Sequence, residues 1–326
     1  MNIQSRREFL QASPIALAAG LSPFSKGLGD GARATEGGSG SESAQIAKML
    51  PENEGKKPLR LGLIVGIGKD PEAAMAKVHE LGLPTCQAYA EEFEAGLAER
   101  LRRALDKYQI EATSLVVGGP GKEEWDFYRG PLTIGLVPRE TRAARIVHIK
   151  KASDFAKSCA IAAVQAHCGF IPENPNDPLY NETVAAMREV VGYCKGNGQN
   201  FRYETGQETP ITLVRAMRDV GLENQGVNFD LANLILYGKA NPVDAMEILG
   251  PYVQGIHAKD GMWPTNPREL GQEVPIGKGR VDFPRIIAQL KKINYRGAVT
   301  IEREISGADQ IRDVREAKSY LEKLIG

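Results

Sequence analysis

Short apolar runs recur along this chain at a regular interval, and this periodicity limits the fold more than any other feature. Each run has six to eight residues rich in β-branched and aliphatic side chains, which is typical of a strand buried on both faces. The runs predict eight strands, at residues 60–66, 85–90, 112–118, 161–168, 200–205, 226–232, 253–259 and 298–304.

Longer segments with helical periodicity separate these runs. Their apolar residues recur at i, i+3, i+4 and i+7, and several end in glycine. They include residues 70–82, 91–109, 140–159, 181–198 and 209–221. Because strands that alternate with helices form parallel sheets, eight such units in about 270 residues predict an α/β fold, a single-domain (β/α)8 TIM barrel.

The turn after the first predicted strand argues against a nucleotide cofactor. An open doubly wound sheet that binds a dinucleotide carries a glycine-rich turn with three glycines at this place. Here the turn has Gly66 and Gly68 but lacks the third glycine. We therefore expect no nucleotide cofactor and favour the barrel over the open sheet.

Composition limits the chemistry further. The 326 residues include 41 Lys and Arg against 41 Asp and Glu, so the net charge is zero and nucleic acid is not an expected partner. The four histidines and four cysteines form no CxxC or HxxxH motif, which argues against a structural zinc module. A metal site in this chain must therefore rely on carboxylates.

The amino terminus resembles a twin-arginine export signal. Arg6 and Arg7 precede a mildly apolar Ala- and Leu-rich stretch, and the Ala-Arg-Ala sequence at 32–34 offers a cleavage site. We expect residues 1–34 to be the signal peptide, 35–57 a flexible linker and 58–326 the barrel. An amphipathic first helix is the alternative. Export implies a periplasmic or secreted protein, not held in the membrane after cleavage, whose substrate is not phosphorylated.

Four polar residues lie at the ends of four consecutive predicted strands. They are Glu204, Asp230, His257 and Glu302. Carboxyl ends of barrel strands form the functional face, so these side chains are expected to converge there. The spacings of 26 residues between the first two and 27 between the next two equal one strand–helix repeat, which predicts equivalent heights on neighbouring strands.

Three carboxylates and one imidazole at a barrel mouth require a cation between them. Like charges at close range in a partly dry cavity are costly unless they are compensated. An oxygen-rich set with one nitrogen suits Mn²⁺, our first choice, or Mg²⁺, with Co²⁺ or Zn²⁺ as alternatives. The sequence therefore predicts a divalent metal site whose ligands are Glu204, Asp230, His257 and Glu302.

The carboxyl half of the chain resembles the xylose isomerase-like superfamily, which includes ketose 3-epimerases and inosose dehydratase-like proteins. The resemblance covers roughly residues 58–326, and it is carried by ETGQE at 204–208, NFDLAN at 228–233, HAKDG at 257–261, PIGKGRVDF at 275–283 and IE at 301–302. It implies the same four metal ligands. It also implies that Glu204 and Glu302 are the catalytic acid/base pair.

The predicted function is that of an exported, metal-dependent sugar isomerase or epimerase. A carboxylate removes a proton beside the carbonyl of a non-phosphorylated sugar or keto-sugar, a metal-stabilised enediolate forms, and a second carboxylate returns a proton. If a leaving group lies β to the carbonyl, the same enolate expels it. A lyase or dehydratase acting on keto-sugars or keto-glycosides is therefore the alternative, and a non-catalytic carbohydrate-binding barrel is the second alternative.

Five further residues are expected to contact the carbohydrate substrate. They are His167, Asn233, Lys259, Asp260 and Trp263. Asn233 stands where ketose 3-epimerases often carry a second histidine, and Trp263 stands about where they carry an arginine. These two departures strengthen the case for the lyase alternative. Long loops after the third and seventh strands could close over substrate or pack against a second copy, so a homo-oligomer is compatible with the sequence.

Overall fold

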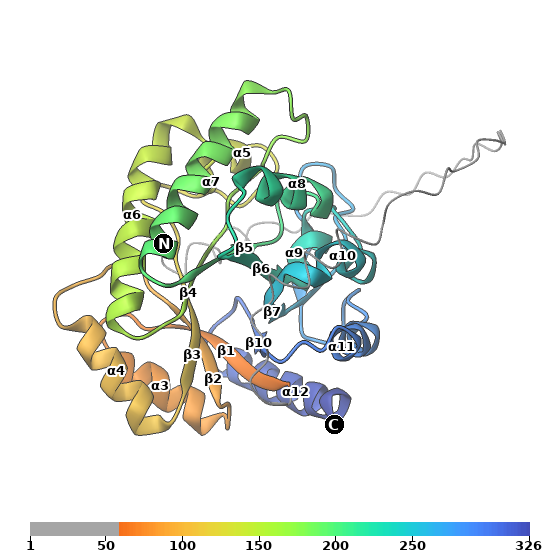
Figure 1. Ribbon diagram of the computed structural model, residues 1–326. Coiled ribbons are helices and arrows are strands. Elements are labelled where there is room, and N and C mark those ends of the chain that lie inside the picture. The colour runs from red at the N-terminus through yellow and green to blue at the C-terminus, as the bar shows by residue number, and fades with distance from the viewer. Residues whose placement is uncertain (1–58) are drawn as a thin grey trace, which may run out of the picture.

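A computed structural model describes residues 59–326 (Figure 1), so the predicted signal peptide at 1–34 and linker at 35–57 lie outside the described residues. Eight parallel strands form a closed barrel, which confirms the predicted fold. The strands are β1 (Arg60–Gly66), β2 (Thr85–Tyr89), β3 (Glu111–Val116), β4 (Ala163–Ala166), β5 (Asn200–Glu204), β6 (Gln225–Asp230), β7 (Val253–Ala258) and β10 (Ala298–Ile301). Each coincides with a predicted run, although most are a few residues shorter.

The order of strands around the barrel is β1-β10-β7-β6-β5-β4-β3-β2. The ring closes where β1 pairs with β10, with Arg60 opposite Ala298. Helices surround the ring of strands in Figure 1, including the β1–β10 pair at which the ring closes. Since every strand points the same way, all eight carboxyl ends open at one mouth.

Eight principal helices form the outer layer. They are α3 (Pro71–Glu80), α4 (Leu97–Tyr108), α6 (Arg139–Ser158), α7 (Pro178–Gly196), α8 (Pro210–Val220), α10 (Pro242–Leu249), α11 (Phe283–Lys292) and α12 (Ala308–Ile325). Shorter turns are α5 (Gly130–Thr133), α9 (Leu231–Leu236) and the 3-10 turn at Gly250–Tyr252.

Several helices begin at an Asp-Pro or Asn-Pro pair. Asp70 accepts a hydrogen bond from the Ala73 amide at 3.1 Å, Asp177 accepts one from Leu179 at 2.9 Å, and Asn241 accepts one from Val243 at 2.8 Å. The proline that follows each cap has no amide proton to lose and its φ already suits the first helical position. These capping contacts therefore fix the residues at which the three helices begin.

Strands and helices share one continuous apolar core. All four residues of β4 are buried, as expected for a parallel strand covered on both faces. The four cysteines, Cys86, Cys159, Cys168 and Cys194, are buried in this region as free thiols. No helix within residues 59–326 combines the length and apolar character needed to cross a bilayer.

The loop after β7 contains a small hairpin that the periodicity does not predict. It consists of β8 (Asp260–Gly261) paired antiparallel with β9 (Glu273–Val274). Each strand has two residues, which is too short to show an alternating pattern. The hairpin holds the long loop beside the barrel mouth.

Candidate metal centre

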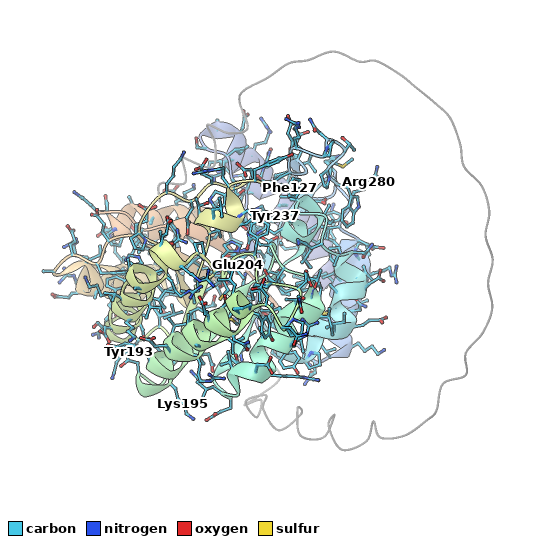
Figure 2. All side chains as sticks on the ribbon, turned by 90° about the horizontal axis from the view of Figure 1, so that it is seen from above. Phe127, Tyr193, Lys195, Glu204, Tyr237 and Arg280 are labelled. Atoms are coloured by element: carbon cyan, nitrogen blue, oxygen red, sulfur yellow. The ribbon has the colours of Figure 1, made fainter. Side chains whose placement is uncertain are left out.

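The structure brings the four predicted ligands together at the barrel mouth. Glu204 ends β5 and Asp230 ends β6, while His257 lies near the end of β7 and Glu302 directly follows β10. One ligand atom from each lies within 4.8 Å of the others, and all four side chains are buried. Figure 2, which looks down from above, shows Glu204 near the middle of the molecule and Lys195 on the outer helix α7.

Strand register explains part of this convergence and corrects one expectation. Asp230 lies directly opposite His257, as the 27-residue spacing predicted. Glu204, however, lies opposite Asn228, two residues before Asp230. The expected equal height of Glu204 and Asp230 is therefore wrong, because neighbouring strands of a tilted barrel are staggered in register.

His257 presents its Nδ1 atom to all three carboxylates. Nδ1 lies 3.0 Å from Glu302 Oε2, 3.3 Å from Glu204 Oε1 and 3.5 Å from Asp230 Oδ2. The other ring nitrogen, Nε2, lies 2.6 Å from Gln87 Oε1. This amide oxygen can only accept, so it places a proton on Nε2. Burial would lower the pKa of His257, but the carboxylates around Nδ1 outweigh it and hold that pKa well above its ordinary value.

Asp230 uses its two oxygens for different purposes. Oδ1 accepts a hydrogen bond from the Asn233 amide at 2.8 Å and so caps helix α9. Oδ2 is buried and has no hydrogen-bond partner among the described residues. The residue therefore fixes the start of a helix and still directs one oxygen at His257.

The buried cluster shifts the pKa values of its members. Burial alone would raise the pKa of Glu204, but His167 and His257 outweigh it and hold that pKa well below its ordinary value. Burial acts likewise on Glu302, where Lys259 and His257 lower the pKa. Both carboxyls are thus ionised at neutral pH. Burial raises the pKa of Asp230, and the negative charge of the nearby Glu302 raises it further.

These donors fit a divalent cation. Asp230 Oδ2 and His257 Nδ1 are buried atoms without a hydrogen-bond partner in the described chain, and both face the ligand cluster. Three carboxylates crowded around one buried imidazole nitrogen are unfavourable unless a positive charge lies among them. Three carboxylates with one imidazole form a hard set of the kind that Mn²⁺ or Mg²⁺ binds.

Lys259 lies against the same cluster. Its Nζ is 3.2 Å from Glu304 Oε2 and 3.5 Å from Glu302 Oε2. It also donates to Asn233 Oδ1 at 3.2 Å. The ammonium group is 1% exposed, so it compensates buried negative charge and holds Asn233 near the ligands. Lys259 was predicted to contact the substrate, and the structure places it in ion pairs with Glu302 and Glu304.

A cavity opens from Glu204 and Glu302 and is bordered by His167. His167 Nε2 lies 3.1 Å from Glu204 Oε1. The Trp125 ring meets the His167 ring edge-on, with centroids 5.0 Å apart. The cavity has a volume of about 100 Å³, which is room for several water molecules.

Two predicted substrate residues lie in other surroundings. The buried Asp260 carboxylate accepts hydrogen bonds from four backbone amides, those of Gly261, Gly277, Gly279 and Val281, at 2.8–3.1 Å. These contacts support a structural role for Asp260 in the loop. Trp263 is 37% exposed in the loop between β8 and β9. Of the five predicted residues, His167 is the one that lines the cavity described above.

Two glutamines near the ligands were not among the predicted site residues. Gln87 on β2 orients His257 and donates to Asn228 Oδ1 at 2.9 Å. Gln165 on β4 donates to Glu204 Oε2 at 3.3 Å. Both are fully buried. A glutamine inside an otherwise apolar strand is a signal that could have identified them, because a buried amide needs polar partners.

Comparison with known proteins agrees with this geometry. The family model of the xylose isomerase-like TIM barrel matches residues 75–324. A solved xylose isomerase domain protein from Planctomyces limnophilus is 35% identical, with a TM-score of 0.78 over 82% of this chain and 97% of that one. A D-psicose 3-epimerase solved in the presence of D-fructose shares the fold at 19% identity and a TM-score of 0.62, over 82% of this chain and 100% of that one.

Sequence comparison also finds relatives of this chain. An uncharacterised protein, MJ1311 from Methanocaldococcus jannaschii, is 25% identical over 68% of this chain and 72% of its own length. A putative L-ribulose-5-phosphate 3-epimerase from Haemophilus influenzae is 40% identical over 22% of this chain and 26% of its own length. The family model covers most of the barrel and includes all four ligand positions. The chain belongs to the xylose isomerase-like TIM barrel family.

Proposed function

We propose that this protein is an exported, divalent-metal-dependent isomerase or epimerase of a non-phosphorylated sugar or keto-sugar. The observation that carries the proposal is that Glu204 and Glu302 both border one cavity and both face His257 Nδ1, at 3.3 Å and 3.0 Å. Ketose 3-epimerase relatives support a carbohydrate substrate. The export part rests on the amino-terminal sequence: Arg6 and Arg7, the apolar stretch that follows them and the Ala-Arg-Ala sequence at 32–34.

The two carboxylates approach the cavity from different sides of the mouth. In the barrel order, β6 and β7 stand between β5, which carries Glu204, and β10, which precedes Glu302. A sugar carbon held between them can lose a proton to one carboxylate and receive one from the other. The lowered pKa of each carboxyl favours the ionised form that accepts a proton, so the group that returns a proton to the opposite face must first take one up from water in the cavity.

Glu204, Asp230, His257 and Glu302 would hold the metal. When bound, a divalent ion acts as a Lewis acid that makes the proton beside a carbonyl easier to remove. The chain supplies the rest: Gln87 orients the imidazole, Lys259 compensates negative charge, and His167 faces the substrate space beside Glu204.

The two arginines that border the cavity are each paired with a carboxylate, which suits a neutral ligand. Arg145 faces Glu123, with 3.6 Å between Nη2 and Oε1. Arg303 contacts Glu273 at 3.1 Å and Asp313 at 2.9 Å. Each guanidinium is thus matched by a carboxylate of this chain, which supports a sugar without a phosphate group.

One observation favours elimination as a second candidate. His167 borders the cavity and lies 3.1 Å from Glu204, so an imidazolium there could protonate a leaving group after Glu204 or Glu302 has removed the proton. The same site would then act as a lyase on a keto-glycoside. Isomerase and lyase differ in product, which the test below detects.

The test is proton NMR in D₂O with Mn²⁺-loaded protein and a panel of ketoses, keto-sugars and 3-keto-glycosides. We expect deuterium to enter beside the carbonyl, with a stereoisomer as the product of an epimerase and a released aglycone as the product of a lyase. Chelation should stop exchange. Glu204→Gln and Glu302→Gln should each slow it about 10²–10⁴-fold.

A matched control is Glu189→Gln on the outer face of α7, where the carboxylate pairs with Lys150 in solvent. It should leave exchange unchanged. Metal content of each variant separates loss of the base from loss of the ion. Full activity in Glu204→Gln or in Glu302→Gln, or activity that survives chelation, would refute the proposal.

A further inference from the structure

The cavity extends beyond the metal ligands to a buried charge pair. Its lining includes Arg145 on α6 and Glu123 in the loop after β3, together with Gly119. Arg145 is 2% exposed and Glu123 is 7% exposed. Since α6 lies outside the strand ring, this end of the cavity is displaced from the barrel axis, on which the four ligands converge.

The guanidinium of Arg145 is held in place. Nη1 donates to the Gly135 carbonyl at 2.7 Å and Nη2 donates to the Thr133 carbonyl. The Nε atom is buried without a hydrogen-bond partner in the described chain. A Cβ on Gly119 would lie 2.5 Å from this Nε, so only glycine leaves room for the guanidinium at the cavity wall. The guanidinium is therefore fixed in the cavity wall, with Nε packed against Gly119.

Apolar and aromatic side chains also line the cavity. They are Val117, Leu136, Ile149 and Trp125. A sugar ring presents an apolar face to such surface and hydroxyl groups at its edge. The wall thus suits a ring that extends away from the ligands.

The charge pair also selects the chemistry of its ligand. Arg145 only donates hydrogen bonds, whereas an ionised Glu123 only accepts them. A hydroxyl group can do both, so neighbouring hydroxyls match the pair, while an anion would be repelled by Glu123 and a cation by Arg145. The two charges sum to zero, which favours a neutral polyol.

We propose that Arg145 and Glu123 form a second sugar subsite, so that the substrate is a disaccharide-like glycoside whose second ring binds there while its first ring lies at the metal ligands. This inference rests on the proposed function, because the first ring is the one that reacts. The subsite itself is a binding property, and it is testable without turnover.

The experiment measures binding by calorimetry with the metal-loaded full chain. The probes are D-glucose and D-galactose, each compared with disaccharides that contain it: trehalose, maltose, cellobiose and lactose. We expect at least one disaccharide to bind about tenfold or more tightly than its monosaccharide, as added hydrogen bonds to charged groups would give. Arg145→Lys and Glu123→Gln should each bring that affinity ratio close to one.

The matched control is Arg142→Lys. Arg142 lies on the same helix and donates to the Leu136 and Val137 carbonyls of the same loop, but it does not border the cavity. It should keep the wild-type ratio. An equal fall of the ratio in both arginine variants would show that Arg145 only supports the loop, which overturns the proposal.

Wild-type protein that binds no disaccharide more tightly than the matching monosaccharide would also overturn it. Failure of the proposed function has a different signature. In that case disaccharides would bind with the expected ratio, yet keto-glycosides of the same rings would show no exchange in D₂O.

Discussion

Replacing Asp260 by Asn distinguishes a structural carboxylate from a substrate-binding one. In the structure, Oδ1 accepts from the amides of Gly261 and Val281, and Oδ2 accepts from those of Gly277 and Gly279. Asparagine keeps one oxygen, so two of the four amides would face an NH₂ group that cannot accept. A buried donor left without its acceptor costs about 1–3 kcal/mol, so we expect a loss of about 2–6 kcal/mol.

The assay is urea denaturation followed by tryptophan fluorescence, with the free energy of unfolding obtained by linear extrapolation. Trp263 lies in the loop that Asp260 organises, so its emission reports that loop directly. Gly279→Ala offers an independent test, because a Cβ there would lie 2.1 Å from Asp260 Oδ1. We expect it to destabilise the protein as well.

The control is Asp282→Asn, the same substitution at an exposed helix cap that accepts from the Arg285 amide at 3.1 Å. Asparagine caps a helix about as well as aspartate, so the change should stay within about 0.5 kcal/mol. An Asp260→Asn variant as stable as this control, but with a raised KM, would refute the structural role and show that Asp260 binds the substrate instead.

Three further outcomes are expected. Gln87→Leu should weaken Mn²⁺ binding about 10–100-fold in calorimetry, because Gln87 orients His257, and unchanged affinity would contradict that role. Burial raises the pKa of Glu208 from 4.5 to about 7, which corresponds to about 3 kcal/mol. Since this folded pKa lies above the unfolded one, the contribution of Glu208 to stability should be greatest below pH 4.5 and be lost as pH rises through 7. Thermal melts of Glu208→Gln should lack this part of the decline, and a decline equal to that of the wild type would disprove the assignment. Replacing Arg6 and Arg7 by Lys should keep the protein in the cytoplasm on cell fractionation, and normal export would show that they are not a signal.

The barrel and the ligand set could be predicted because both follow from one periodicity. A strand end recurs every repeat, so Asp230 and His257 were placed on neighbouring strands from spacing alone, and the register pairs them. The stagger of Glu204 could not be predicted, since register depends on how the whole ring closes. His167 and Lys259 were placed near the ligands because they adjoin predicted strand ends, and both contact the ligand cluster.

Residues positioned by irregular loops could not be predicted in this way. Asp260 follows a ligand strand, which suggested a substrate role, but its partners at 277–281 come from a distant part of the loop. Arg145 lies on the buried face of a helix and meets the cavity only because the 118–136 segment folds back against it. No local pattern in the sequence describes that path.

The position of β10 in the ring makes the metal centre a property of the finished barrel. Three ligands are carried by the consecutive strands β5, β6 and β7, but Glu302 follows the strand that joins β7 to β1. A folding intermediate that has not yet paired β10 with both neighbours holds three of the four donors, with His257 missing its nearest carboxylate. High affinity for the proposed ion would therefore arise only at ring closure, and metal retention would distinguish closed molecules from open ones in a mixed population.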